Sequence, residues 1–336
     1  MENVKVLRRF DYVDALRGYS ILLVIAVHYS LYFETLYPSY FIKLSSLGQY
    51  GVGLFFLVSA YTLTKSLNYR FDERESQIFK KYFLRRFFRI APLYYLYLLY
   101  HYFFLNDFNQ GNNITDLNYL AHFIFLDMLY IDFINSILRL EWTISVEVFF
   151  YLFLPFFFKK SLKILVIFLF ITILISMFTL VYRKYFNEDY HMLHFTILEW
   201  SYYFIAGIFI AKWNFNFFIK NNFLLLIIFF NIALMSIIHL PFQHYLMFIT
   251  LTIFFIYIKK EINTNVFNNI IIFIGKISFS IYLSHFIVLR YTINYFGINF
   301  YCMILSLIIT LIISIITFYV IEQPFIKFGK FITRKI

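Results

Sequence analysis

The stretch that decides the fold is Asp14-Ala-Leu-Arg-Gly-Tyr-Ser-Ile-Leu-Leu-Val-Ile-Ala-Val-His28. It is apolar enough to cross a bilayer as a helix, although it carries Arg17 near its start and His28 at its end. About three helical turns separate these two residues, so both side chains leave one face, roughly 16 Å apart along the axis. An ionisable group inside a membrane helix is costly and is by default a functional candidate. The alternative is a histidine that is simply hydrogen-bonded within a helix bundle.

The composition indicates a polytopic membrane protein, although 336 residues could also form two soluble domains. Hydrophobic residues make up 62% of the chain, charged residues only 14%, and the mean hydropathy is +0.75. The net charge of +11 comes from basic residues beside apolar segments, which favours topology signals and an anion site over nucleic-acid binding. The single cysteine, Cys302, excludes an internal disulfide and is expected to face lipid or the core.

Ten apolar segments reach the length of about 20 residues that a membrane span needs. They lie near residues 13–33, 49–67, 91–108, 141–158, 161–182, 195–212, 221–240, 242–258, 270–290 and 299–320. The first lacks a small-residue cleavage site, so we expect a retained span and not a signal peptide. A further apolar stretch, 117–134, is interrupted by Asp116, His122, Asp127 and Asp132.

Basic segments decide between ten spans and eleven. With ten spans, both termini share one side with Lys5–Arg9, Lys65–Arg89, Lys159–Lys163, Lys212–Lys220, Lys259–Lys260 and Lys327–Lys335. An eleventh span would move several of these segments outside, against the positive-inside rule. The sequence therefore predicts an all-α polytopic membrane protein, residues 1–336 forming one domain with about ten transmembrane helices, cytoplasmic termini and no separate soluble domain. Stretch 117–134 is then re-entrant or interfacial, and the loop 68–90 is partly helical along the membrane surface.

Two polar motifs have both a functional and a structural interpretation. Arg85, Arg86 and Arg89 precede the span that opens with Pro92, and the planar guanidinium suits phosphate. The same three arginines could equally serve as positive-inside anchors. The segment Gly48-Gln-Tyr-Gly-Val-Gly-Leu-Phe-Phe-Leu-Val-Ser-Ala60 holds three of the nine glycines, which either open a helix end toward a ligand or allow close helix packing.

Two further motifs place ionisable groups in the outer half of predicted spans. Glu141-Trp-Thr-Ile-Ser-Val-Glu147 puts Glu147 below the outer surface, where a carboxylate needs a partner or a raised pKa. Gly275-Lys-Ile-Ser-Phe-Ser-Ile-Tyr-Leu-Ser-His285 brings Ser284 and His285 to a similar depth, and a hydrogen-bonded core histidine is the alternative there. His191 and His194 lie near Glu188, Asp189 and Glu199, but no supporting ligand pattern is present, so we expect no metal.

Taken together, these segments resemble membrane-bound acyltransferase family three, the bacterial polysaccharide and peptidoglycan O-acyltransferases. The motifs occur in family order over essentially the whole chain: Asp14-Ala-Leu-Arg17 with its spacing to His28, Gly51-Val-Gly-Leu-Phe-Phe-Leu-Val-Ser59, Arg85-Arg-Phe-Phe-Arg-Ile-Ala-Pro92, Trp142-Thr-Ile-Ser-Val-Glu147, Ser278-Phe-Ser-Ile-Tyr-Leu-Ser-His285 and Ile321-Glu-Gln-Pro324. Two positions depart from the pattern. Ala60 stands where a glycine commonly follows the serine, and Thr143-Ile144 replaces a more usual Ser-Leu.

The resemblance implies an integral-membrane O-acyltransferase, most simply an O-acetyltransferase, in the bacterial cytoplasmic membrane. It implies a cytoplasmic acyl-coenzyme A donor, with acetyl-coenzyme A expected, and a carbohydrate acceptor on the outer side, such as O-antigen, capsule or lipooligosaccharide. It also implies a stand-alone membrane domain without the extracytoplasmic esterase-like domain that some relatives carry. No metal and no nucleic acid enter this scheme.

From these motifs we assign candidate roles. His28 is the candidate general base on the acceptor hydroxyl, with an acyl-histidine intermediate left open. Glu147, Ser145 and His285 are the other candidate catalytic residues, and Glu147 is expected either to orient His28 or to stabilise the imidazolium. Donor phosphates are assigned to Arg17, Arg85, Arg86 and Arg89, and the acceptor sugar to Trp142, Tyr50 and Ser284. The rival class is a transporter or flippase of a lipid-linked sugar, although no internal repeat is present. A scaffold in a polysaccharide-synthesis complex would leave His28 and Glu147 unexplained.

Overall fold

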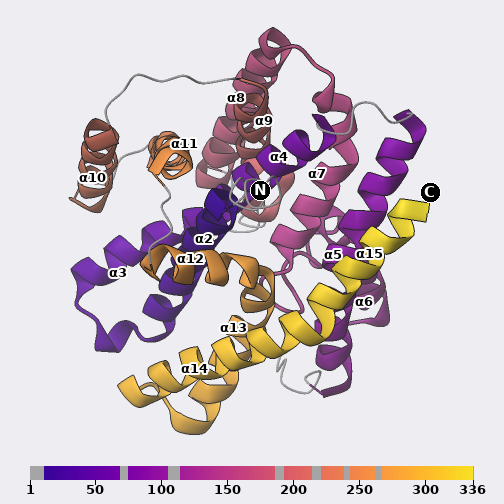
Figure 1. The fold of residues 1–336 in the computed structure, drawn as a ribbon. Helices are drawn as coiled ribbons and strands as arrows, with labels where there is room; N and C mark the ends of the chain where they lie inside the picture. The colour runs from indigo at the N-terminus through magenta and orange to yellow at the C-terminus, as the bar shows by residue number, and fades with distance from the viewer. Residues whose placement is uncertain are drawn as a thin grey trace. The chain divides into compact units, whose positions relative to one another are not determined.

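A computed structural model describes residues 11–68, 75–104, 114–185, 193–213, 221–237, 243–261 and 266–335. Every regular element within these ranges is helical, which confirms the all-α class (Figure 1). Five helices are long and apolar enough to cross a membrane, and a bent pair makes a sixth. The chain is therefore a multi-pass membrane protein. Ten spans, one domain and cytoplasmic termini stay predictions, and the basic segment Lys5–Arg9 lies outside the described residues.

The chain packs as two compact units. The first, unit 1, comprises Met1–Val58 with Asn214–Leu311, and unit 2 comprises Ser59–Trp213 with Ile312–Ile336. Two of the three boundaries fall inside helices, α4 (Gly51–Asn68) and α14 (Phe300–Thr317).

Unit 1 is organised around α2 (Asp11–Tyr32), the helix that the opening stretch predicts. After it come the short helix η1 (Glu34–Leu36), α3 (Ser39–Ser46), η2 (Leu47–Tyr50) and the start of α4. The rest of unit 1 is α10 (Asn221–Ile237), α11 (Gln243–Glu261), α12 (Val266–Lys276), α13 (Ser278–Phe296) and the start of α14.

Helix α12 crosses α2 so closely that only glycines fit at the crossing. A Cβ on Gly275 would lie 1.6 Å from the Asp14 carbonyl oxygen, and one on Gly18 would lie 2.3 Å from the Ile271 carbonyl oxygen. The glycines of the second motif also serve packing. A Cβ on Gly48 would lie 2.2 Å from the Leu23 carbonyl oxygen of α2. Close helix approach is the small-residue packing that membrane helices use.

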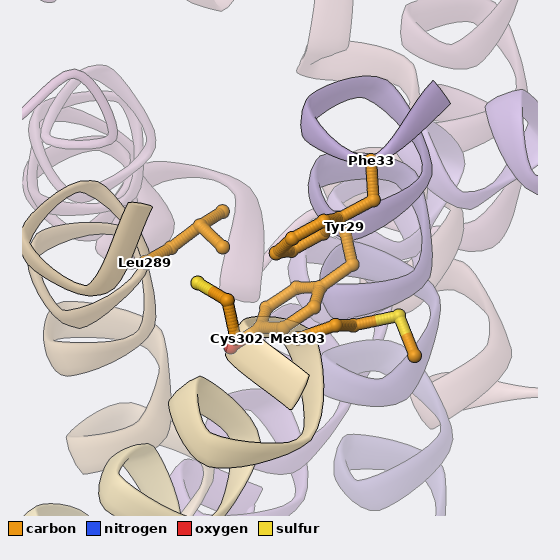
Figure 2. Packing of buried hydrophobic residues seen from close by; sticks show 5 residues of the cluster. All are labelled: Tyr29, Phe33, Leu289, Cys302 and Met303. Carbon is orange, nitrogen blue, oxygen red and sulfur yellow. The ribbon is translucent and has the colours of Figure 1, made fainter. Parts of the chain in front are cut away.

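An apolar cluster fastens the far end of α2 to α13 and α14. Figure 2 shows Tyr29 and Phe33 with Leu289, Cys302 and Met303, all buried. Cys302 is fully buried, which confirms one of its two expected settings, the core. The cluster holds α2 and α13 together near the level of the histidines.

Unit 2 contains the rest of α4, α5 (Glu75–Phe104), α6 (Asp116–Phe123) and η4 (Asp127–Leu129). It continues with α7 (Trp142–Phe158), α8 (Leu162–Tyr185), α9 (Ile197–Lys212), the end of α14, the π-helical turn η6 (Phe318–Glu322) and α15 (Gln323–Lys335). Helix α8 packs on α9, and α15 packs on α5.

Two segments differ from the sequence expectations. The expected span 270–290 is broken, because α12 and α13 meet at a bend of 76°. Residues 75–90 are helical, as expected for part of the loop 68–90, but they continue without a break into the next span, because α5 runs from Glu75 through Pro92 to Phe104. Residues 105–108 of that expected span lie outside the described residues.

Stretch 117–134 follows the expectation. It holds only the eight-residue α6 and the three-residue η4, which are too short to cross a bilayer as a helix.

The crossing of α2 and α12 gives a stability prediction. Gly275→Ala should destabilise the protein by about 1–3 kcal/mol, because the new methyl group meets backbone and not a movable side chain. Denaturation of the detergent-purified protein measures the effect. Ala26→Leu is the control, since it adds bulk on an exposed position of α2. Equal stability of the two variants would contradict the close approach.

Candidate active site

Two histidines meet in unit 1. His28 of α2 and His285 of α13 approach with 3.2 Å between His28 Nδ1 and His285 Nε2, and their ring centroids lie 5.2 Å apart. His285 is fully buried, whereas His28 is partly exposed. The sequence singled out both residues but did not predict their contact. The bend between α12 and α13 and the crossing at Gly275 place the α13 face opposite α2.

The hydrogen bonds of this pair determine which nitrogen of His28 is available. His285 Nδ1 lies 3.1 Å from the Ile281 carbonyl oxygen, and a carbonyl can only accept, so this nitrogen carries a proton. In the neutral ring, His285 Nε2 is then an acceptor, and His28 Nδ1–H donates to it. The remaining lone pair of His28 is therefore on Nε2. A neutral imidazole held in one tautomer is the arrangement that a general base requires.

The other predicted residues of unit 1 have varied surroundings. Phe286 lies edge-on to the His28 ring at 5.7 Å, and Ser284 Oγ donates to the Ile281 carbonyl within its own helix. Buried Tyr50 is edge-on to His244 at 5.2 Å. Arg17, at the other end of α2 from His28, bonds Asp14 at 3.3 Å. Unit 1 therefore brings together His28 of α2 and His285 of α13, and Arg17 lies on α2 with His28.

A second group of polar side chains surrounds Glu147 in unit 2. Ser59 Oγ of α4 donates to Glu147 Oε1 at 2.5 Å, and the Tyr151 hydroxyl donates to the same oxygen. The Ser59 and Tyr151 oxygens lie 3.1 Å apart. The sequence predicted that Glu147 needs partners but identified neither. Ser59 lies in the glycine motif, and Tyr151 lies one turn after Glu147, so helical spacing was the signal for Tyr151.

The first part of α5 lies beside this group. The Tyr82 hydroxyl donates to the Tyr151 carbonyl at 3.2 Å, and Arg86 is near enough for its charge to act on both tyrosine hydroxyls. We expected Arg86 at the inner face and Glu147 in the outer half. The α5 turn that carries Tyr82 and Arg86 lies beside the α7 turn that carries Tyr151, and the depth of either residue in the membrane stays a prediction.

Proline explains why the Tyr151 carbonyl accepts a side chain. In a helix this carbonyl would bond the N–H four residues later, but that residue is Pro155, which has no N–H. Tyr82 supplies the missing donor from α5. A buried carbonyl without a partner would cost free energy, so this bond joins α5 to α7.

The other arginines have different settings. Arg85 Nε donates to Thr333 Oγ1 of α15 at 2.7 Å, and both Arg86 and Arg89 are partly exposed. The side chains of Arg85 and Arg89, one helical turn apart, project from neighbouring positions on one face of α5. Of the four arginines predicted to bind the donor, Arg85 contacts α15 and Arg86 lies near the Glu147 group.

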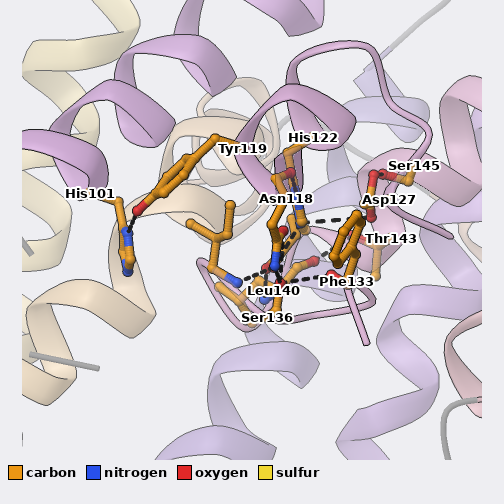
Figure 3. Close-up of polar contacts among 12 residues, drawn as sticks. His101, Asn118, Tyr119, His122, Asp127, Phe133, Ser136, Leu140, Thr143 and Ser145 are labelled. Atoms are coloured by element: carbon orange, nitrogen blue, oxygen red, sulfur yellow. Dashed lines mark hydrogen bonds and ion pairs between the residues drawn. The ribbon is translucent and has the colours of Figure 1, made fainter. Parts of the chain in front are cut away.

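Ser145 belongs to a buried charge network (Figure 3). Its hydroxyl donates to Asp127, and His122 Nε2 lies 3.3 Å from Glu141 Oε1 and 3.9 Å from Asp127 Oδ2. Glu141 also accepts the backbone N–H groups of Ile137 and Leu140, at 2.7 and 2.8 Å. His122, Asp127, Glu141 and Ser145 are all fully buried. The network attaches the α6–α7 connection to the start of α7.

The pKa values of this network show how its charges compensate. Burial raises the pKa of Asp127 to about 6, although the charge of His122 and the Ser145 hydroxyl act against that rise. Burial lowers the pKa of His122, but the hydrogen bond and charge of Glu141 outweigh it, so the pKa is raised overall. A protonated His122 between two carboxylates is therefore the favoured state.

Trp142 lies in an aromatic group at the start of α7. Its ring centroid is 6.0 Å from His194, 5.2 Å from Phe195 and 5.7 Å from Trp200. Beside this group, buried Glu199 accepts from Arg183 at 3.0 Å and contacts His194 Nδ1 at 2.7 Å. His191, Glu188 and Asp189 lie outside the described residues. Within the described part of the chain, no three potential ligands gather closely enough to hold a metal ion.

Comparison with known proteins now identifies the family. A family model described as an acyltransferase domain, acyltransferase family 3, matches residues 10–321, nearly the whole chain. The chain belongs to this family. The expected resemblance is confirmed, and the motifs that carried it include both histidines of the pair and Glu147.

A curated relative extends the comparison. The chain is 28% identical over 162 residues to the peptidoglycan O-acetyltransferase OatA of Listeria monocytogenes serovar 1/2a (strain ATCC BAA-679 / EGD-e). The match covers 45% of this chain and 24% of the relative, so the chain matches only about a quarter of that relative's length. No solved structure matches the chain. The chain is therefore a multi-pass membrane protein of the acyltransferase family.

The hydrogen bond of Tyr82 gives a prediction that distinguishes the contribution of its hydroxyl from the packing of its ring. Tyr82→Phe should cost about 1 kcal/mol of stability, because the Tyr151 carbonyl loses its donor. In a Pro155→Ala background the cost should fall toward zero, because the alanine amide at position 155 supplies that donor. Unfolding of the two single variants and the double variant measures the coupling. Additive effects would contradict this account.

Proposed function

We propose that this acyltransferase is an O-acyltransferase, most simply an O-acetyltransferase, in which His28 is the general base. The observation that carries the proposal is the His28–His285 contact, which leaves the Nε2 lone pair of His28 available. The support from outside the site is the family membership and the printed activity of the relative.

The chemical step is balanced around His28 Nε2. The acceptor hydroxyl gives its proton to Nε2 as its oxygen attacks the thioester carbonyl carbon. A carbon–oxygen bond forms, the carbon–sulfur bond breaks, and the leaving thiolate takes the proton back from the imidazolium. The products are an O-acyl ester and a free thiol. Attack by Nε2 itself, through an acyl-histidine intermediate, would use the same lone pair.

His285 is a positioning residue in this scheme. It accepts the proton of His28 Nδ1, and this interaction strengthens as His28 becomes positively charged in the transition state. The role expected of Glu147, which is to orient His28 or to stabilise the imidazolium, stays a prediction. For Glu147 we retain a catalytic assignment within its own group, where Ser59 and Tyr151 hold one carboxylate oxygen and leave the other for substrate. Ser145 is proposed to support that part of α7 through its bond to Asp127.

We propose acyl-coenzyme A, expected to be acetyl-coenzyme A, as the donor. Its phosphates require cationic groups with fixed geometry, and Arg17, Arg85, Arg86 and Arg89 are the candidates. Arg17 is supported by its place on the same helix as His28, about 16 Å away along the axis. Arg85 is supported by its bond to Thr333, which fixes the guanidinium while leaving its terminal nitrogens free of that bond.

The acceptor proposed is a hydroxyl of a cell-envelope carbohydrate, on the outer side of the bacterial cytoplasmic membrane. Its support is the relative named for peptidoglycan O-acetylation. The proposed acceptor contacts remain Tyr50 and Ser284 of unit 1 and Trp142 of unit 2. Ten spans with cytoplasmic termini remain the proposed topology.

The direct test is turnover by purified protein in detergent or nanodiscs. The protein should release free coenzyme A from acetyl-coenzyme A when a cell-envelope glycan is supplied, and the glycan should gain one acetyl mass per event. The bend of α12 and α13 also resembles the broken helices of transporters, so a vesicle assay for movement of lipid-linked sugar is the second arm. Movement without coenzyme A release would replace our proposal with the transporter.

The base and its positioning residue differ in their expected kinetics. His28→Ala should reduce kcat at least 100-fold, because proton transfer contributes about 10²–10⁴-fold. His285→Phe keeps a ring but cannot accept the His28 proton, so kcat should fall about tenfold or more with little change in KM. Thr292→Val, a buried change on the same helix, is the control. Wild-type kcat in His28→Ala would refute the assignment of the base.

The arginines should act on donor affinity. Arg85→Ala combined with Arg89→Ala should raise the KM for acetyl-coenzyme A about tenfold or more while the acceptor KM stays nearly constant, because two phosphate contacts are lost. Steady-state kinetics with each substrate varied in turn measure this. Lys159→Ala with Lys163→Ala, exposed cations on other segments, are the matched control. A larger effect on the acceptor would show that these arginines are membrane anchors only.

A further inference from the structure

Helix α15 carries four basic side chains and no acidic one, and it has three distinct faces. One face packs on α5. A Cβ on Gly329 would lie 2.8 Å from the Phe88 side chain, and Thr333 accepts from Arg85. Gly329 and Thr333 are four residues apart, so they lie on the same side of the helix.

The second face is aromatic and exposed. Phe325, Phe328 and Phe331 follow at intervals of three residues, with 40%, 49% and 53% of their surfaces exposed. Phe328 touches Phe88 edge-on at 5.3 Å at the border of the packed face. Exposed large apolar side chains in a row indicate contact with protein or lipid.

The third face is basic. Lys327, Lys330 and Arg334 recur at intervals of three and four residues and are all exposed. With 3.6 residues per turn, the packed, aromatic and basic faces are separated by roughly 120° each. A helix that lies in a membrane interface has this pattern, with phenylalanines toward the acyl chains and cations toward the phosphates.

The length of the helix places α15 at the membrane boundary. The helical segment Phe300–Lys335 has 36 residues, which corresponds to roughly 54 Å. The hydrocarbon core is only about 30 Å thick. One end must therefore extend beyond the core, and the charges of α15 identify that end. At the boundary between the hydrocarbon core and the headgroups, the phenylalanines of α15 can still reach acyl chains while its basic face meets headgroups.

We propose that α15 is a binding site for anionic phospholipid, independent of the acyl-transfer chemistry. Its basic face binds the headgroup phosphate and its phenylalanines contact the acyl chains. A free phosphate shares the headgroup chemistry but would gain nothing from the aromatic face, which favours lipid as the occupant.

The test is native mass spectrometry of the full-length purified protein titrated with short-chain phosphatidylglycerol or phosphatidylcholine. Wild type should bind phosphatidylglycerol at least tenfold more tightly. Each basic residue near an anionic surface strengthens binding about fivefold, so Lys327→Gln with Lys330→Gln and Arg334→Gln should weaken phosphatidylglycerol binding about 100-fold. Phe325→Ser with Phe331→Ser should weaken the binding of both lipids, because the acyl-chain contacts are shared.

Matched variants keep this test decisive. Lys159→Gln with Lys163→Gln and Lys260→Gln removes the same charge from exposed positions elsewhere and should change binding less than threefold. Lys327→Arg with Lys330→Arg keeps the charge and should retain binding, and unchanged thermal unfolding of all variants shows that they fold. Three results would overturn the proposal. The first is an equal loss of binding in both charge-removal variants, and the second is competition by millimolar inorganic phosphate. The third is a changed oligomeric state in the Lys327→Gln, Lys330→Gln, Arg334→Gln variant. The last outcome would assign the surface to a second copy of the chain.

Discussion

The close approach of α12 to α2 is the constraint on which unit 1 depends. Gly18 and Gly275 remove the side chains that would hold the two backbones apart, so carbonyl oxygens of one helix lie where a Cβ of the other would be. The chain then bends by 76° into α13. This bend directs α13 along α2, and the apolar cluster around Tyr29 and Leu289 holds the pair together beyond the histidines. The His28–His285 contact is thus a consequence of backbone packing.

Unit 2 solves a different problem, the placement of carboxylates among apolar helices. Three of the buried or half-buried acids there have specific partners: hydroxyls for Glu147, His122 and backbone N–H groups for Glu141, and Ser145 for Asp127. An unpaired charge in these positions would cost several kcal/mol. The α6–α7 connection also holds three non-glycine residues at positive φ, Phe125, Asn135 and Arg139. Such strained conformations persist where the surrounding bonds determine the backbone, as the buried network does here.

The sequence predicted much of this fold because membrane helices leave strong local signals. Apolar length identified α2, α8 and α9 almost to the residue, and the interrupting acids correctly marked 117–134 as unable to form one spanning helix. Local sequence signals did not predict features of the fold that depend on contacts between residues far apart in the chain. Nothing in 270–290 reports a bend, because Gly275 is explained only by the Asp14 backbone that it meets. Similarly, hydropathy gives no sign that the α5 turn of Tyr82 packs beside α7, because the bond between the Tyr82 hydroxyl and the Tyr151 carbonyl is a long-range contact. The motifs identified His28, His285 and Glu147, but the contacts of these residues are seen only in the three-dimensional structure.

The first half of α5 joins features that the sequence treated as separate. Tyr82 and Arg86 face the Glu147 group, while Arg85 and Phe88 face α15. These residues lie within two turns of one helix, so a shift of α15 cannot be absorbed between them. The Tyr82 bond to the carbonyl freed by Pro155 fixes one side of α5, and the Thr333 bond fixes the other. Arg85, whose Nε donates to Thr333, therefore lies on a helix that is bonded on two sides, to α7 and to α15. Within unit 2 the first half of α5 thus links α15 to the helix that carries Glu147, through one bond to a backbone carbonyl and one to a side-chain hydroxyl.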